Sequence, residues 1–111
     1  MKRTILGILT CSAALAACVP AKNSIDIDTS GSPNVSGVGV LCDKETPLIV
    51  RGDHLIATVP ITCEGVGEIR LRLGDGASAT CQVGYVTPGI GQEFYFVLQR
   101  GQCIPVSTEV R

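Results

Sequence analysis

The sequence predicts an all-β fold, namely a small antiparallel β-sandwich or barrel of about six or seven short strands held by two disulfides. Apolar and β-branched residues alternate with polar ones over short segments, and no segment beyond residue 17 shows a helical period. Turn-forming residues recur about every ten residues between these segments. Because an antiparallel sheet has to cover its apolar face and protect its edges, we expect a second sheet or closure into a barrel.

Residues 1–17 predict an export signal that does not belong to the fold. Lys2 and Arg3 give a positive start, and residues 4–15 form an apolar run that is too short for a comfortable bilayer-spanning helix. The run leads into Leu15-Ala16-Ala17-Cys18, which resembles the lipobox of bacterial lipoprotein precursors. This resemblance implies that residues 1–17 are removed and that Cys18 receives a diacylglycerol and becomes the acylated first residue. Ordinary signal cleavage after Ala17, without a lipid, is the alternative.

A lipidated Cys18 predicts a place at a membrane of the bacterial cell envelope. Stable anchoring requires more than one acyl chain, and a triacylated cysteine meets that requirement. In enteric bacteria, an Asp directly after the lipidated Cys favours retention in the inner membrane. This chain has Val19 at that position, so the analogy implies the outer membrane, facing the periplasm. Without residues 1–17, seven of the nine Lys and Arg remain against ten Asp and Glu, a net charge near −3. This balance gives no basis for nucleic-acid binding.

The six cysteines predict two disulfides in an exported domain. Cys11 lies in the signal and Cys18 is the predicted lipidation site, which leaves the even set Cys42, Cys63, Cys81 and Cys103. Zinc ligation is a weaker alternative, because these four are spaced 21, 18 and 22 residues apart and zinc sites usually contain close pairs. No C-x-x-C redox motif is present, and we expect neither a metal nor a cofactor.

Turn chemistry favours one of the three pairings that four cysteines allow. Gly52-Asp53 is typical of a two-residue hairpin turn, in which directly opposed residues have numbers that sum to 105. Cys42 and Cys63 satisfy this sum, and Cys81 and Cys103 then pair by elimination. Each bridge closes a loop of about 22 residues and stabilises the domain by about 3 kcal/mol in the chain-entropy model.

The chain divides into a signal peptide over residues 1–17, the lipidated Cys18 with a flexible tether over residues 18–34, and the disulfide-stapled β domain over residues 35–111. Polar and turn-forming residues dominate the tether, which reads V-P-A-K-N-S-I-D-I-D-T-S-G-S-P-N after Cys18. A flexible coil of this length spans about 20–25 Å, so we expect the domain to lie just off the bilayer headgroups.

The strands expected in the domain follow from alternation and from the turns between them. They cover residues 35–42, 48–51, 54–63, 68–73, 79–85, 94–98 and 103–106. The side chains expected to face inward are Leu55, Ala57, Val59, Ile61, Cys63, Ile69, Leu71, Leu73, Ala79, Cys81, Val83, Tyr85, Phe94, Phe96 and Leu98. Tyr95 points away from Phe94 and Phe96, either to the outer face or into a second layer, and we favour burial by the other sheet.

No group of residues forms a recognisable catalytic motif. His54 is the only histidine, and it has no evident nucleophile, because the cysteines are committed and no G-x-S-x-G elbow is present. We interpret it as an exposed turn histidine. Arg51-Gly52-Asp53 matches the integrin-recognition tripeptide, but Gly-Asp is ordinary turn chemistry and short matches are common by chance. Arg70 and Arg72 indicate a solvated strand face rather than an anion-binding patch.

These features predict a small, membrane-anchored envelope lipoprotein that is not an enzyme and has a binding or structural role. Its expected partners are the membrane, through the lipid, and an envelope protein or the cell wall. The alternative is a periplasmic inhibitor. Cys63-Glu64-Gly65 and the alternating strand to Leu73 resemble the membrane-bound lysozyme inhibitors, which are small lipidated β-barrels, although the loop those proteins insert into lysozyme is absent. A hydrolytic enzyme is a third possibility that lacks a nucleophile–base pair.

Overall fold

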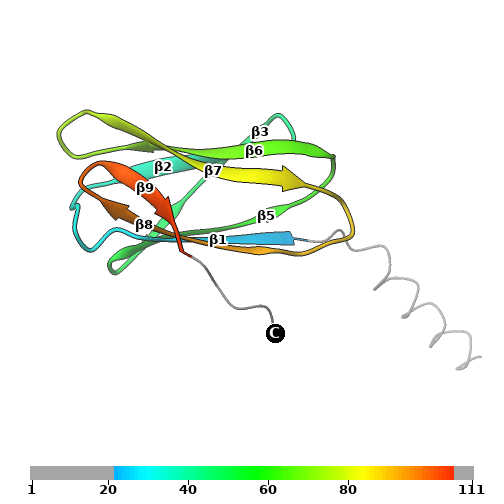
Figure 1. Ribbon diagram of the computed structural model, residues 1–111, viewed down its shortest axis with the longest axis horizontal. Helices are drawn as coiled ribbons and strands as arrows, with labels where there is room; N and C mark the ends of the chain where they lie inside the picture. The colour runs from blue at the N-terminus through cyan, green and yellow to red at the C-terminus, as the bar shows by residue number, and fades with distance from the viewer. Residues whose placement is uncertain (1–21, 107–111) are drawn as a thin grey trace, which may run out of the picture.

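The computed structural model describes residues 22–106, which form a β-sandwich of two packed sheets (Figure 1). The strands are β1 (Lys22–Asp28), β2 (Ser36–Leu41), β3 (Lys44–Pro47), β4 (Ile49–Arg51), β5 (His54–Pro60), β6 (Gly65–Arg72), β7 (Ser78–Val86), β8 (Glu93–Gln99) and β9 (Gln102–Pro105). The all-β prediction is confirmed, and of the two expected architectures the sandwich is correct and the closed barrel is wrong. The described residues form nine strands where six or seven were expected, because β1 and β3 were not predicted.

The two sheets differ in strand direction. The four-stranded sheet, in the order β3-β2-β6-β7, is antiparallel throughout. The five-stranded sheet has the order β4-β5-β1-β8-β9, and in it β1 and β8 run parallel. A wholly antiparallel fold was therefore wrong. Side-chain alternation reports which face a residue occupies and carries no information on the direction of the neighbouring strand.

The flexible tether expected over residues 18–34 is wrong over Lys22–Asp28, which is strand β1, at the centre of the five-stranded sheet. Residues 29–34 form the loop to β2, and the signal peptide expected over residues 1–17 and the first part of the tether lie outside the described residues. Ile25 and Ile27 are buried between the sheets and alternate with Asp26 and Asp28 on the outer side. This period-two pattern is short and is flanked by polar residues, so its composition is typical of a linker. Pairing with β5 on one side and β8 on the other stabilises the strand nevertheless.

The core lies between the two sheets, and most side chains expected to face inward do so. Those that are buried include Leu55, Val59, Ile61, Ile69, Leu71, Cys81, Val83, Phe96 and Leu98. Leu73, Ala79, Phe94 and Cys103 are half-buried against this core. Alternation alone therefore placed the inner faces of β5, β6 and β8 correctly.

Two tyrosines depart from the expected pattern. Tyr85 is 58% exposed, because a β-bulge opposite the Gly67–Glu68 step shifts the alternation at Gly84 and buries Val86 instead. Gly84 has a φ of 88°, a conformation that glycine adopts without strain. Tyr95 is 37% exposed on the outer face of β8, so its expected burial by the other sheet is wrong.

Both expected disulfides are present, Cys42–Cys63 and Cys81–Cys103, with Cα–Cα distances of 5.5 and 5.3 Å. The predicted register of the β4–β5 hairpin is also correct, since Ile49 opposes Ile56. The physical reason for the first pairing is different, however. Cys42 lies in the tight turn between β2 and β3, with a φ of 55°, and Cys63 lies where the chain passes from β5 to β6. The Cys42–Cys63 bridge therefore ties the β2–β3 turn to the β5–β6 connection, outside the β4–β5 hairpin, while Cys81–Cys103 links β7 of one sheet to β9 of the other.

Candidate functional site

The outer face of the five-stranded sheet brings together carboxylates, the histidine and apolar side chains. We name it the His54 face and define it by Asp26, Asp28, His54, Tyr95, Val97 and Ile104. Asp28 lies between His54 of β5 and Val97 of β8, while Asp26 opposes Tyr95. The face exists because β1 alternates Ile and Asp, so that burying the isoleucines places both carboxylates on the outer side.

His54 forms the closest polar contact on this face. Its Nδ1 lies 2.6 Å from Oδ1 of Asp26, in the diagonal position across the β1–β5 ladder. The hydrogen bond to Asp26 raises the pKa of the imidazole above its ordinary value, and the charges of Asp26, Asp28 and Asp53 act in the same direction. The face therefore favours a protonated imidazolium held by a carboxylate, and both groups are accessible to solvent.

Asp28 is fixed by the loop that follows β1. Its Oδ1 accepts a hydrogen bond of 2.9 Å from the backbone N–H of Ser30, and this bond lowers the pKa of the carboxyl. In the same loop, the backbone N–H and the hydroxyl of Thr29 both donate to the carbonyl of Asp53, at 2.7 and 3.0 Å. The Arg51-Gly52-Asp53 turn is thus tied to the β1–β2 loop and borders the His54 face.

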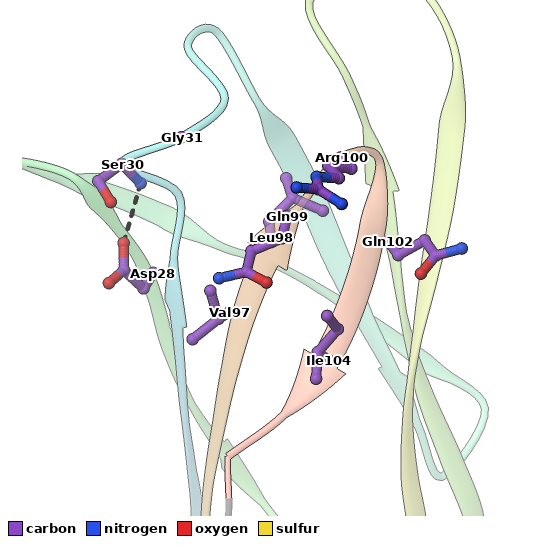
Figure 2. A pocket seen from close by; sticks show the side chains of 9 residues that line it. All are labelled: Asp28, Ser30, Gly31, Val97, Leu98, Gln99, Arg100, Gln102 and Ile104. Atoms are coloured by element: carbon purple, nitrogen blue, oxygen red, sulfur yellow. Dashed lines mark hydrogen bonds between the residues drawn. The ribbon is translucent and has the colours of Figure 1, made fainter.

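A shallow groove runs along the face from His54 to the end of the sandwich. One part, of about 420 Å³, is lined by Asp26, His54, Tyr95 and Val106 among others. The other part, of about 750 Å³, lies between the β1–β2 loop and the β8–β9 turn that carries Arg100 (Figure 2). Asp28 and Val97 line both parts, which therefore adjoin.

Figure 2 shows how the groove is arranged at this end. The Asp28 carboxylate and its bond to Ser30 lie on one side, and Val97 and Ile104 lie on the strands beside it. Such a surface offers hydrogen-bonding carboxylates next to an apolar strip.

The groove does not assemble a recognisable reaction centre. Within residues 22–106, no Ser, Thr or Cys side chain hydrogen-bonds to His54, whose ring contacts a carboxylate instead. In the same range no group of three or more His, Cys, Asp or Glu side chains is arranged to hold a metal ion.

The other residues singled out from the sequence have separate places. Cys18 lies outside the described residues. The four remaining candidate cysteines are in disulfides. Arg70 lies on the outer face of the four-stranded sheet, where its Nε donates to Glu68 at 2.6 Å, so its charge is already paired.

Sequence reasoning missed Asp26 and Asp28, because both were assigned to the tether. The Ile-Asp-Ile-Asp alternation in residues 25–28 was the available signal for a half-buried strand. Recognising it would have placed two carboxylates on one face, although nothing in the sequence indicates that His54 lies beside them.

No protein-family model matches the chain, and no curated protein or solved structure is significantly similar to it. The described part of the chain contains no helix long and apolar enough to cross a membrane. A function for this protein therefore rests on the chemistry of its own residues.

Proposed function

We propose that this protein is a small envelope lipoprotein, anchored in a membrane through Cys18, which binds another envelope component without catalysing a reaction. The observation that carries the proposal is the cysteine arrangement. The four cysteines of the described residues pair with one another in two disulfides, which leaves none of them to pair with Cys18. Cys18 ends the motif Leu15-Ala16-Ala17-Cys18, which resembles a lipobox, so acylation gives this cysteine a role that needs no disulfide partner.

The partner proposed for the domain is an envelope protein or a cell-wall polymer, and the proposed location is the periplasmic side of the outer membrane. The His54 face supplies the contact surface, because it combines Asp26 and Asp28 with accessible Val97 and Ile104. No observation favours the alternative of a lysozyme inhibitor, since the family that the sequence resembles forms barrels and this chain forms an open sandwich.

Lipidation is tested by growing a bacterium that exports the full precursor with a clickable fatty acid and then detecting label on the protein. We expect labelling of the wild type and of the Cys11→Ser variant, whose cysteine lies in the signal. We expect none on Cys18→Ser. Labelling of Cys18→Ser, or no label on the wild type, contradicts the proposal.

The binding role is tested by placing a photo-cross-linking amino acid at single positions and irradiating intact cells. We expect position 97, on the His54 face, to trap a defined envelope component. Position 72, which is exposed on the outer face of the opposite sheet, serves as the matched control. Trapping of the same component from position 72 with none from position 97 shows that another surface makes the contact.

A further inference from the structure

We infer that the end of the sandwich where β1 begins rests directly on the bilayer that holds the Cys18 anchor, with Ile90 in contact with lipid. This inference rests on the proposed lipidation of Cys18. The occupant of this end is therefore the membrane surface itself, and the contact is apolar.

The length of chain between Cys18 and β1 limits how far the first residue of β1 can lie from the membrane. Four residue steps separate Cys18 from Lys22, the first residue of β1, and a fully extended chain covers at most about 3.6 Å per step, or about 14 Å in total. The headgroup region on each side of a bilayer is about 5–8 Å thick. With the acyl chains of Cys18 inserted, Lys22 is held within or next to this region, much closer than the 16-residue tether expected from the sequence would allow.

The loop between β7 and β8 is fixed beside this point. The backbone N–H of Ser24 donates to the carbonyl of Gln92 at 2.9 Å, and the buried Asn23 side chain accepts from the N–H of Gln92 at 3.0 Å. A Cβ at Gly91 would lie 3.0 Å from the carbonyl oxygen of Lys22, so the backbones approach closely here. Figure 1 shows this loop at the end of the sandwich where β1 starts. Whatever holds Lys22 at the membrane therefore also holds the loop there.

Three large apolar side chains are exposed at this end. Ile90, at the tip of the β7–β8 loop, is 54% exposed. Val66 and Tyr85 face each other across β6 and β7 near the same end and are 73% and 58% exposed. Charges of both signs surround them, Lys22 and Lys44 against Asp43, Glu64 and Glu93, so an electrostatic attraction to anionic lipid does not drive the contact.

The opposite end of the sandwich is formed by one loop and three tight turns. It consists of the β1–β2 loop and of turns at residues 52–53, 74–76 and 100–101, whose residues are Gly, Asp and Arg. None of the exposed large apolar side chains of the described residues belongs to these three turns. Ile49 and Val50 of β4, which are 59% and 65% exposed, lie next to the 52–53 turn. Exposed apolar area is therefore present near both ends, and the short chain between Cys18 and Lys22 decides which end meets the bilayer.

The test uses the fact that the chain contains no Trp. The full precursor carrying Ile90→Trp is lipidated in a bacterial host and reconstituted into phosphatidylethanolamine–phosphatidylglycerol vesicles that contain acyl chains brominated near the headgroup. Ala77→Trp is the matched control, because position 77 is exposed and lies about 30 Å along β7 from Val86. Flotation of the vesicles establishes anchoring separately for each variant.

We expect both variants to float with the vesicles. The fluorescence at position 90 should fall roughly twofold, because an interfacial side chain lies about 5–10 Å deep, within reach of the bromines. The fluorescence at position 77 should not change. If Ile90→Trp is not exported, Val66→Trp reports on the same end.

Flotation without quenching at position 90 overturns this inference and leaves the lipid anchor intact. A wild-type protein that neither floats nor carries fatty acid overturns the proposed function, and this inference with it. Equal quenching at positions 77 and 90 overturns the assigned orientation, because the domain then lies on its side.

Discussion

Removing each disulfide in turn gives a quantitative test of how the sandwich is stabilised. The two bridges close loops with sequence separations of 21 and 22 residues. In the chain-entropy model, each loop of this length contributes about 3 kcal/mol to the free energy of unfolding. On entropy alone, the two double variants Cys42→Ala/Cys63→Ala and Cys81→Ala/Cys103→Ala should therefore be equally destabilised.

The two disulfides differ in how deeply their cysteines are buried. Cys81 is fully buried in the core, whereas Cys42 and Cys63 are only half-buried. Replacing a buried Cys with Ala removes the sulfur and its packing contacts, which lowers the free energy of unfolding by about 1 kcal/mol beyond the loss of loop closure. We therefore expect a loss of about 3 kcal/mol for Cys42→Ala/Cys63→Ala and about 4 kcal/mol for Cys81→Ala/Cys103→Ala.

The assay is urea unfolding of the exported chain in a Cys18→Ser background, which removes the proposed anchor from all samples. Far-UV circular dichroism is the appropriate signal, because the chain has no Trp and only two Tyr. The reasoning is refuted if either double variant is as stable as its parent. It is also refuted if Cys42→Ala/Cys63→Ala proves the less stable of the two, since burial then does not decide the order.

Two further predictions concern the His54 face and the β2–β6 contact. Since Asp26 raises the pKa of His54, this ion pair stabilises the fold fully below the ordinary His value of 6.5, and the contribution is lost as pH rises through the raised pKa. An NMR titration of His54 should show a higher midpoint in wild type than in Asp26→Asn, and equal midpoints would contradict the hydrogen bond. Gly37→Ala should destabilise the fold by about 1–3 kcal/mol, because the added Cβ would lie 2.6 Å from a methyl carbon of Leu71. Gly39→Ala, whose nearest contact would be 3.6 Å, should unfold in urea close to wild type, and a larger loss than for Gly37→Ala would exclude overpacking as the cause.

Several elements were predictable because their signal is local. Strict alternation in residues 69–73 placed Ile69 and Leu71 in the core and Arg70 outside. Gly52-Asp53 and Gly74-Asp75-Gly76 each fixed a turn between neighbouring strands, and the first also fixed the β4–β5 register. In each case the preference of a residue for water, for the core or for a positive φ acts within a few positions of the chain.

Other features depended on partners distant in the sequence. The pattern of β1 resembles that of a linker until β5 and β8 pair with it, and the outward position of Tyr85 follows from a bulge that depends on the opposing strand β6. The pairing of Cys42 with Cys63 was predicted correctly for an incomplete reason, because Cys42 lies in the β2–β3 turn and Cys63 in the β5–β6 connection, and neither is part of the β4–β5 hairpin.

The sequence by itself determined that residues 22–106 are all-β and that four cysteines pair, and it predicts a lipoprotein signal in residues 1–18. Only the tertiary structure decided that Lys22–Asp28 is a central strand and that His54 meets Asp26, 28 residues earlier in the chain. The physical reason is that alternation and turn chemistry act between neighbours along the chain. Sheet order and contacts across a face depend instead on which strands cover one another's apolar sides, and that choice is made by the packing of the whole domain.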